Sequence, residues 1–595
     1  MASTFFGLNI ATSALYAYQT GLNTTAHNIA NAETKGYSRQ TINTKATDAM
    51  RLYCTAGMAG TGVEVTDIAQ VRDEYYDTRF RQNASKLGEY ATKEDYMLQI
   101  QNFFNEINTS GTTTEFNNFF NALESLRGTP ADVDKRTQVI NYASSITDYF
   151  NSIANNLSRI QENCNSEIKN KVDKINNIAQ QVVSLNQQIN TIEITGARAN
   201  DLRDERNRLI DQLSEIVPVE TREVHMGDSN LHNFEVKISD QILVDGYDSN
   251  KLLCVPREVT ANQSDAQGIY DIKWNFTDGQ EFKLNDITLT GELRGLIDIR
   301  DGNNNECFKG TVTGTVGESK VTVTDTNYNL FSQITLPKTG EITFNNKVYQ
   351  YTGFTAQKAA DGTVTYTFDL KDALDADVSA TARVGQDINY KGIPYYQAQL
   401  NEFVRTFAAK VNEIQNSAID LNGDKGIDIF NGIDKVTGKN YTLDESETTF
   451  SSTSDSYYQI TAQNFSITEE MKGNPNKIAT ILEGNESAGI DQQGVVDKLI
   501  ALKNEKGMFQ KGTFSEFLIA IVSDIGIDTT KVKNFHESQT DIVNTIKNQR
   551  YSVSGVESNE ESMNVMKYQR GYNLASKMIS VMNECLNKLI NEMGV

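Results

Sequence analysis

Residues 131–195 read ADVDKRTQVINYASSITDYFNSIANNLSRIQENCNSEIKNKVDKINNIAQQVVSLNQQINTIEIT and contain no Gly or Pro. Apolar side chains recur here at alternating spacings of three and four residues, the heptad period of a helix that packs along a partner. At 1.5 Å per residue the pattern predicts a helical rod roughly 80 Å long. The heptad positions are Val139, Ala143, Ile146, Phe150, Ile153, Leu157, Ile160, Cys164, Ile168, Lys171, Ile175, Ile178, Val182, Leu185, Ile189 and Ile192.

Start and stop signals flank this helix. Thr129 is expected to be its N-cap, with Pro130 at the first helical position and Asp132 in an acidic first turn. Gly196 is expected to end it, because a glycine readily adopts the left-handed conformation that follows a helix. Shorter amphipathic helices are expected near residues 68–107, 114–127 and 198–216.

The two ends of the chain carry heptad stripes of their own. At 1.5 Å per residue they predict terminal helices of roughly 35 and 45 Å. Because terminal segments are usually frayed, apolar stripes there indicate helices that await a partner, although packing on the protein's own core is the alternative. The stripes are Leu8, Ala11, Leu15, Tyr18, Leu22, Thr25 and Ile29, and then Val565, Tyr568, Tyr572, Ala575, Ile579, Met582, Leu586, Leu589 and Met593.

After Pro218 the apolar period changes from helical to alternating. Residues 234–244 alternate and end at Asp245-Gly246, which predicts strands and a turn. Further strands are expected over 302–392, including a hairpin at Asn345-Asn346. Helix returns at about 394–416 and again from about 495. The fold class predicted is multidomain α+β: a long α-helical, coiled-coil rod formed by the N- and C-terminal regions, with inserted β-rich outer domains and both termini at one end.

This pattern divides the chain into seven expected segments. Two helical assembly segments lie at the ends, a rod domain is contributed by two separate parts of the chain, and β-rich or mixed segments lie between. The segments are 1–60 (N-terminal assembly), 61–217 (rod, N-terminal part), 218–301 (β-rich), 302–392 (inserted β domain), 393–475 (helix plus mixed β and loop), 476–550 (rod, C-terminal part) and 551–595 (C-terminal assembly).

Composition excludes several classes of protein. The 595 residues carry 55 Lys and Arg against 78 Asp and Glu, a formal net charge of −23. Such a balance argues against nucleic-acid binding, which needs a basic surface. No apolar segment reaches the length of a transmembrane helix, so no membrane insertion is expected. The first basic residue is Lys35, which argues against a cleaved secretory signal.

Motifs for catalysis, cofactors or metals are weak. The four histidines, His27, His225, His232 and His536, have no ligand spacing, and phosphate-binding and nucleophile motifs are lacking. The five cysteines are isolated, so neither a disulfide framework nor a zinc site is expected. Residues 420–426 begin like a calcium loop but lack its glycine and its final glutamate, so we interpret them as an Asx-rich turn. No catalytic residue, cofactor or metal is predicted.

The most specific motifs lie beside the terminal stripes. Residues 30–39 read ANAETKGYSR, and residues 549–556 read QRYSVSGV, followed by Glu560-Glu561 and by YQRGY at 568–572. These blocks resemble the terminal signatures of the bacterial flagellar rod, hook and junction proteins. Ser554-Gly555-Val556 is more similar to the junction members. The resemblance continues at 60–65, Ile68, 71–73, 200–206, 243–246, 295–301, 400–412, 420–422 and 460–462.

The resemblance implies a non-enzymatic structural protein, secreted to the extracellular flagellum, in which terminal helices form the inner tube of a layer between hook and filament. It implies as partners further copies of the chain in a ring or helical layer, the hook protein, a second hook-filament junction protein, an export chaperone on the C-terminal helix and the flagellar type III export apparatus. The expected assembly interface is Leu8, Leu15, Tyr18, Leu22, Ile29, Asn31, Thr34, Gly36, Tyr37, Ser554, Gly555, Val556, Tyr568, Gln569, Tyr572, Ile579, Met582, Leu586 and Leu589.

The segment 302–392 matches this family least and carries the alternative hypothesis. In that alternative the chain is a secreted adhesin or enzyme on a flagellar axial scaffold, with the insert as its active module. Under the first hypothesis the insert is expected to have its own core and to be dispensable for the junction, because the proposed contacts lie in the terminal helices.

Overall fold

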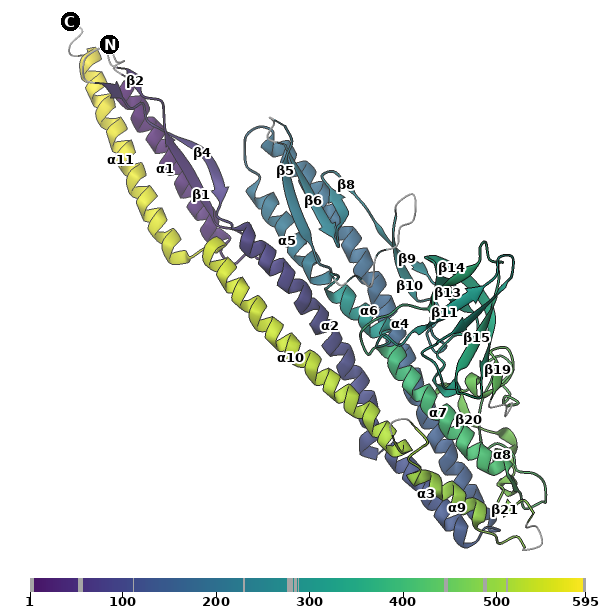
Figure 1. Cartoon of the computed structure of the whole chain (residues 1–595). Coiled ribbons are helices and arrows are strands. Elements are labelled where there is room, and N and C mark those ends of the chain that lie inside the picture. The colour runs from purple at the N-terminus through teal and green to yellow at the C-terminus, as the bar shows by residue number, and fades with distance from the viewer. Residues whose placement is uncertain are drawn as a thin grey trace.

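The computed structural model describes residues 5–51, 57–110, 112–227, 231–275, 282, 286, 288–443, 448–484, 489–509 and 512–591. The molecule is elongated, and both termini lie together at one end (Figure 1). Long helices run the length of the molecule, and the β-rich parts lie along one side of them. This is the predicted α+β class with a helical rod. Within the described ranges, no helix has both the length and the apolar character needed to cross a membrane.

Two antiparallel helices form the end that carries the termini, and we call them the terminal pair. They are α1 (Phe6–Ala30) and α11 (Ser558–Asn591). An antiparallel ribbon of β1 (Gln40–Ala46) and β4 (Val63–Gln70) lies against α1. A shorter hairpin joins β2 (Met50–Arg51) to β3 (Met58–Ala59).

The rod below the terminal pair is made of long helices from both halves of the chain. Helix α2 packs along α10, which begins with a capping box between Thr513 and Glu516. The rod helices are α2 (Glu74–Ser110), α3 (Thr112–Gly128), α4 (Val133–Glu193), α5 (Asn200–Ile216) and α10 (Phe514–Ser554).

Helix α4 is the rod that the heptads predict, but its predicted start is wrong. The helix begins at Val133, and its N-cap is Asp132, whose carboxylate accepts the backbone N–H groups of Asp134 (3.0 Å) and Lys135 (3.4 Å). A carboxylate near the positive end of the helix dipole outcompetes the Thr129–Pro130 signal. The C-terminal signal is confirmed, because α4 ends at Glu193 and Gly196 has a φ of 89°.

The heptad face of α4 forms the core of the rod. Its apolar positions from Val139 to Ile189 are buried, whereas Ile192 lies 39% exposed near the end of the helix. Toward the far end of the rod, aromatic side chains from α3, α4, α7 (Ile393–Asn416) and α10 pack on one another. They include Phe116, Phe150, Phe403, Phe407, Phe514 and Phe517.

The first β-rich region, 218–301, is fastened to α4 by amide side chains. Asn176 accepts the N–H of Leu252 (2.9 Å) and donates to its carbonyl (2.8 Å), and Asn190 does the same with His232. Each side-chain amide thus bonds both the N–H and the carbonyl of one strand residue, as the backbone of a neighbouring strand would. The elements are β5 (Glu220–His225), β6 (His232–Ile238), β7 (Gln241–Asp245) and β8 (Asp248–Ser249) in one sheet, β9 (Leu252–Pro256) with β10 (Tyr270–Trp274) in another, and α6 (Glu292–Asp301).

The insert is a closed six-stranded barrel with its own core. Strand β13 pairs with both β14 and β16, which closes the sheet, and Asn345 and Asn346 form the predicted hairpin turn with positive φ. Aromatic rings, among them Phe308, Tyr366 and Phe368, fill the interior. The strands are β11 (Phe308–Gly314), β12 (Lys320–Thr324), β13 (Gly340–Phe344), β14 (Lys347–Lys358), β15 (Val364–Leu370) and β16 (Val378–Val384).

The barrel is less separate from the rod than the sequence indicates. Its two ends lie side by side as expected, since the N–H of Gly392 donates to the carbonyl of Gly302 (3.1 Å). However, β19 (Thr449–Ser451) adds to the edge of the barrel sheet at β14, and Tyr458 is buried in the barrel core. Residues from the segment predicted as 393–475 therefore complete the barrel.

The remaining elements connect the barrel to the end of the rod. As predicted, residues 420–426 form an Asx turn: the Asp420 carboxylate accepts the N–H groups of Asn422 (2.7 Å) and Asp424 (3.0 Å) and pairs with Lys477 (3.5 Å). The elements are β17 (Ala418–Ile419) with β21 (Ile481–Leu482), β18 (Phe430–Gly432) with β20 (Phe465–Ile467), α8 (Glu469–Gly473) and α9 (Gly494–Ala501).

Candidate assembly interface

The base of the terminal pair is organised by one buried amide. Asn28 of α1 accepts the Tyr37 hydroxyl (2.7 Å) and the N–H of Gln40 (3.0 Å), and it donates to the Gln40 carbonyl (2.9 Å). It also donates to the carboxylate of Glu561 in α11 (3.1 Å). A single side chain thereby joins both terminal helices to the first strand of the ribbon.

Glu561 is the acidic partner in this arrangement, and it is only 1% exposed. The Arg39 guanidinium donates to it at 2.8 Å and pairs with the neighbouring Glu560 at 2.9 Å. Burial is the main reason why the pKa of the Tyr37 hydroxyl is raised well above its ordinary value, and the nearby carboxylates of Asp201, Asp204 and Glu561 raise it further. Tyr37 therefore stays a hydrogen-bond donor. The base is thus a satisfied polar centre within an apolar helix pair.

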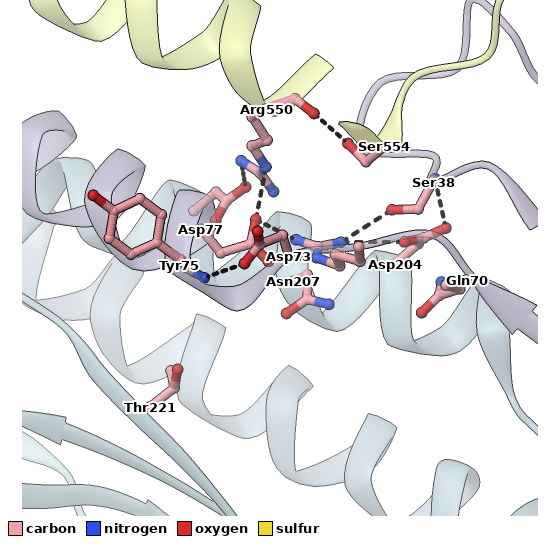
Figure 2. A network of polar contacts seen from close by, with 12 residues as sticks. Ser38, Gln70, Asp73, Tyr75, Asp77, Asp204, Asn207, Thr221, Arg550 and Ser554 are labelled. Carbon is pink, nitrogen blue, oxygen red and sulfur yellow. Dashed lines mark hydrogen bonds and ion pairs between the residues drawn. The ribbon is translucent and has the colours of Figure 1, made fainter. Parts of the chain in front are cut away.

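Below this base, an alternating chain of charges joins the terminal pair to the rod (Figure 2). Arg81 of α2 pairs with Asp211 (2.9 Å), Asp211 with Arg550 (2.7 Å) and Arg550 with Asp77 (2.7 Å). The chain continues from Asp77 to Arg72 (2.6 Å), from Arg72 to Asp204 (3.3 Å) and from Asp204 to the backbone N–H of Ser38 (2.9 Å). We call these six side chains the joint cluster.

The joint cluster is buried enough for its charges to depend on one another. Burial by itself lowers the pKa of Arg72, but the Asp77, Asp211 and Asp204 carboxylates together more than offset this effect and the pKa is raised. Burial raises the pKa of Asp204 above its ordinary value, although the Ser38 N–H and Arg72 favour its charged form. Its side chains come from α2, α5, α10 and the connection between β4 and α2, which holds Arg72. Because Asp204 also accepts the N–H of Ser38, just after α1, the cluster fixes the terminal pair relative to the rod.

Arg550 links α10 to two other helices, because it pairs with Asp77 of α2 and with Asp211 of α5. Replacing it with methionine, which keeps most of the aliphatic stem, is expected to cost about 2–3 kcal/mol, because two charge-assisted hydrogen bonds are lost while Asp77 and Asp211 retain Arg72 and Arg81. Thermal unfolding with hydrogen exchange over 540–557 measures the loss. Lys533→Met is the matched control, since its exposed pair with Glu537 spans 4.0 Å and its loss is expected to cost less than about 0.5 kcal/mol. Equal melting of both variants would contradict the linking role.

The structure brings the sequence-predicted interface residues together at this end of the molecule. In α1, Leu8, Leu15, Tyr18 and Leu22 are half-buried and Ile29 is 41% exposed. In α11, Tyr568, Tyr572, Ile579, Met582 and Leu586 are half-buried, whereas Gln569 and Leu589 are exposed. The stripes are thus only partly covered within one chain.

The predicted signature residues form the two connections at the base. Asn31 caps α1, its side chain accepts the Thr34 hydroxyl (3.1 Å), and Gly36 turns the chain with a φ of 86°. On the other connection the Ser554 carbonyl accepts the N–H of Arg39 (2.9 Å). Gly555 lies where an added Cβ would meet the Tyr551 ring at 2.8 Å, and Val556 is buried.

A second apolar stripe runs along α11 beside its contact with α1, and part of it borders Tyr18. Leu574 is 67% exposed, and its neighbours along the stripe, Met563, Met566, Met578 and Val581, are exposed as well. Sequence reasoning missed this stripe because it examined one heptad seam. It missed Asn28 and the joint cluster because single polar residues in helices resemble solvated ones. The available signal for the stripe was a recurrence every four residues, at Met566, Arg570, Leu574 and Met578.

Charge is distributed unevenly between this end and the rest of the chain. Residues 1–60 contain four Lys or Arg and two Asp or Glu, and residues 551–595 contain four and five respectively. The rod and outer regions, residues 61–550, therefore carry a formal net charge of −24, more than the whole of the chain's −23. Close packing of many terminal pairs would not be opposed by like charges, whereas the outer surfaces repel one another.

Three sequence models of protein families match the chain. The family described as "Flagellar hook-associated protein FlgK helical domain" matches residues 97–310. "Flagella basal body rod protein" matches residues 8–37, and "Flagellar basal body rod FlgEFG protein C-terminal" matches residues 543–592. These two regions contain most of the terminal pair, so the helices and the matches together define the chain as an axial protein of the bacterial flagellum.

Relatives match along the whole chain. A protein of Bacillus subtilis (strain 168) named flagellar hook-associated protein 1 is 26% identical, covering 100% of this chain and 99% of the relative. Proteins of the same name from Salmonella typhimurium (24%) and Escherichia coli K12 (25%) each cover 98% of this chain and 99% of their own length. The solved structure of the flagellar hook junction protein FlgK from Burkholderia pseudomallei aligns with a TM-score of 0.46 and 15% identity over 81% of this chain and 100% of that one. The chain is thus similar along its whole length to proteins named flagellar hook-associated protein 1.

Proposed function

We propose that this protein is a structural subunit of the bacterial flagellum that forms the layer between hook and filament through its terminal helices. One observation carries the proposal: two terminal helices, matched by flagellar rod families, pair at one end of a rod and leave an apolar stripe uncovered. Burying a leucine-sized side chain contributes about 1.5–3 kcal/mol, so covering this stripe with neighbouring subunits would stabilise the layer.

The proposed partners follow from this role. Further copies of the chain would pack around the terminal pair in a ring or helical layer, with the hook protein on one side and a second hook-filament junction protein on the other. Before assembly, an export chaperone would cover the C-terminal helix, and the type III export apparatus would carry the chain out. The exposed methionines of α11 suit such exchange between partners, because their flexible side chains adapt to different surfaces. The proposed location is the extracellular flagellum, and the proposed role is non-enzymatic.

The alternative, an adhesin or enzyme whose active module is the insert, has less support. The barrel interior is filled by packed side chains such as Tyr351, Phe354 and Tyr366. Among the described residues, no group of three or more histidine, cysteine or acidic side chains is arranged to hold a metal ion. The family matches include the terminal helices and much of the rod, and relatives named flagellar hook-associated protein 1 match along the whole chain, the barrel included.

The variant Leu574→Asp tests the proposal. Leu574 is exposed, so the folded monomer should keep its stability within about 0.5 kcal/mol. Inside an assembled layer the same carboxylate would be desolvated without a partner, which is costly. We expect exported protein in the medium, hooks without filaments by electron microscopy, and loss of motility. Asn573→Asp, one residue away on an exposed polar face of α11, is the control and should assemble. Normal filaments on Leu574→Asp cells would contradict the proposal.

A further inference from the structure

The two terminal helices contain the same four-residue pattern, Tyr-Gln-x-Gly. Residues 18–21 of α1 read YQTG, and residues 568–571 of α11 read YQRG. Because the helices are antiparallel, the two copies meet head to tail: Tyr568 packs on Gly21, and Tyr18 packs on Gly571. A Cβ on Gly21 would lie 2.8 Å from Tyr568 Cδ1, and one on Gly571 would lie 2.6 Å from Tyr18 Cε1. Each helix thus supplies one tyrosine ring and one notch, the space that the missing side chain of its glycine leaves for the other helix's ring.

Two further contacts follow the same register. Gly7 of α1 faces the terminal methyl of Met582, and Asn28 donates to Glu561. In all four pairs (7 with 582, 18 with 571, 21 with 568, and 28 with 561) the residue numbers add to 589. One constant register therefore holds from the base of the terminal pair to its tip.

We propose that the paired Tyr-Gln-x-Gly motifs and the Asn28–Glu561 pair together specify the single register in which α1 and α11 associate. The heptad stripes alone do not, because a slip by seven residues would keep apolar positions in contact. A slip in one direction places Tyr568 opposite Asn28. A slip in the other places the Glu561 carboxylate opposite Gly21. Either slip removes a ring from its notch and leaves buried polar groups without partners.

Glycine at these positions otherwise has no advantage. Within a helix it is less stabilising than alanine, because it loses more backbone freedom on folding. At Gly21 and Gly571 the obstructing atoms belong to the rigid tyrosine ring, so a methyl group there forces the helices apart. At Gly7 the obstruction is the end of the flexible Met582 side chain, which can move aside. The structure therefore ranks Gly21 and Gly571 above Gly7 as register residues.

The inference deepens the proposed function and rests on it for its biological meaning. The register sets which residues of α11 extend beyond Phe6 and where the stripe around Leu574 lies relative to α1. Neighbouring subunits would meet one defined surface only if every copy pairs in this register. A mixture of registers would offer neighbours surfaces displaced by about 10 Å per heptad.

The register can be measured in the isolated full-length chain by disulfide crosslinking. Ala14 and Ala575 fall at the observed register, whereas Ala14 and Met582 fall one heptad away. In a chain with Cys54→Ser and Cys585→Ser, the pair Ala14→Cys with Ala575→Cys should crosslink under mild oxidation. The pair Ala14→Cys with Met582→Cys should crosslink about tenfold less.

Adding Gly21→Ala and Gly571→Ala should lower the in-register yield about fivefold to tenfold and raise the displaced one. Gly7→Ala should have little effect. Gly526→Ala is the matched control, because Gly526 is also mid-helix and its added Cβ would meet only Gln101 Nε2, at 3.9 Å. This control should leave both yields unchanged.

Several results would overturn the inference. They are equal crosslinking of both cysteine pairs, failure of both, or yields that do not respond to Gly21→Ala and Gly571→Ala. These outcomes concern an isolated chain, so they are independent of whether Leu574→Asp cells grow filaments. A register-locked pair in a protein that proves not to build the junction would refute the proposed function and leave the register assignment intact.

Discussion

Arg405→Met is expected to lower the free energy of unfolding by about 3–5 kcal/mol, the largest single-residue effect that the structure indicates. Arg405 lies in α7, is 2% exposed, and joins the rod to the barrel. Its guanidinium donates to the carbonyls of Ser332 (3.1 Å), Ile334 (2.7 Å), Tyr458 (2.8 Å) and Ile460 (2.8 Å). It also donates to the Gln263 side chain.

The cost arises because these acceptors come from three separate segments and none is a carboxylate. Burial lowers the pKa of Arg405 to about 10, so the group remains charged at neutral pH and its hydrogen bonds are charge-assisted. Methionine fills most of the volume but leaves several buried carbonyls unpaired, at about 1–3 kcal/mol each. Lysine should be little better, since a compact ammonium cannot reach acceptors on three sides.

Calorimetry and hydrogen exchange over 330–336 and 458–462 measure this effect. Arg383→Met is the control, because Arg383 lies on an exposed position of the barrel strand β16 and its loss should change stability by less than about 0.5 kcal/mol. If Arg405→Met melts like the control, the barrel is held to the rod by other contacts.

The sequence predicted the helices well because their pattern is local. In α4 every apolar heptad position up to Ile189 is buried, and the period of 3.5 residues is visible in any short window. The start of α4 was missed because Thr129-Pro130 and Asp132 both carry N-terminal signals, and only the backbone conformation decides between them. The hairpin at Asn345-Asn346 was predicted because turn chemistry is equally local.

The polar parts of the candidate interface could not be predicted in the same way. Asn28 and Glu561 are 533 positions apart, and Arg405 finds its acceptors on segments 53 to 142 residues away. In sequence, each resembles a polar residue on a solvated helix face. Only the Tyr-Gln-x-Gly motif repeats visibly at both ends, and its meaning depends on the helices being antiparallel.

Deleting the barrel tests the domain division most severely. Replacing residues 304–390 with a short Gly/Ser linker is expected to lower the melting temperature of the remaining chain by roughly 10–20 °C and to reduce its soluble yield. The sequence alone predicts that this segment is dispensable for the junction and that the rod stays intact without it. The structure predicts a loss of stability, because the deletion removes the Ser332 and Ile334 carbonyls from Arg405 and the Leu336 carbonyl from the Tyr458 hydroxyl. It also exposes Phe450 and Tyr458, which pack against the barrel core.

A compensated deletion separates this effect from a loss of assembly contacts. Combining the deletion with Arg405→Leu, Phe450→Ser and Tyr458→Ser removes the stranded cation and the two uncovered rings, and we expect it to regain most of the lost thermal stability. If the compensated protein is stable and exported and filaments attach, the barrel serves the fold of its neighbours rather than the junction. If it is stable but filaments detach, the barrel contributes a contact between subunits. Should the simple deletion melt like the full chain, the shared core around Tyr458 contributes little and the original division at 302–392 stands.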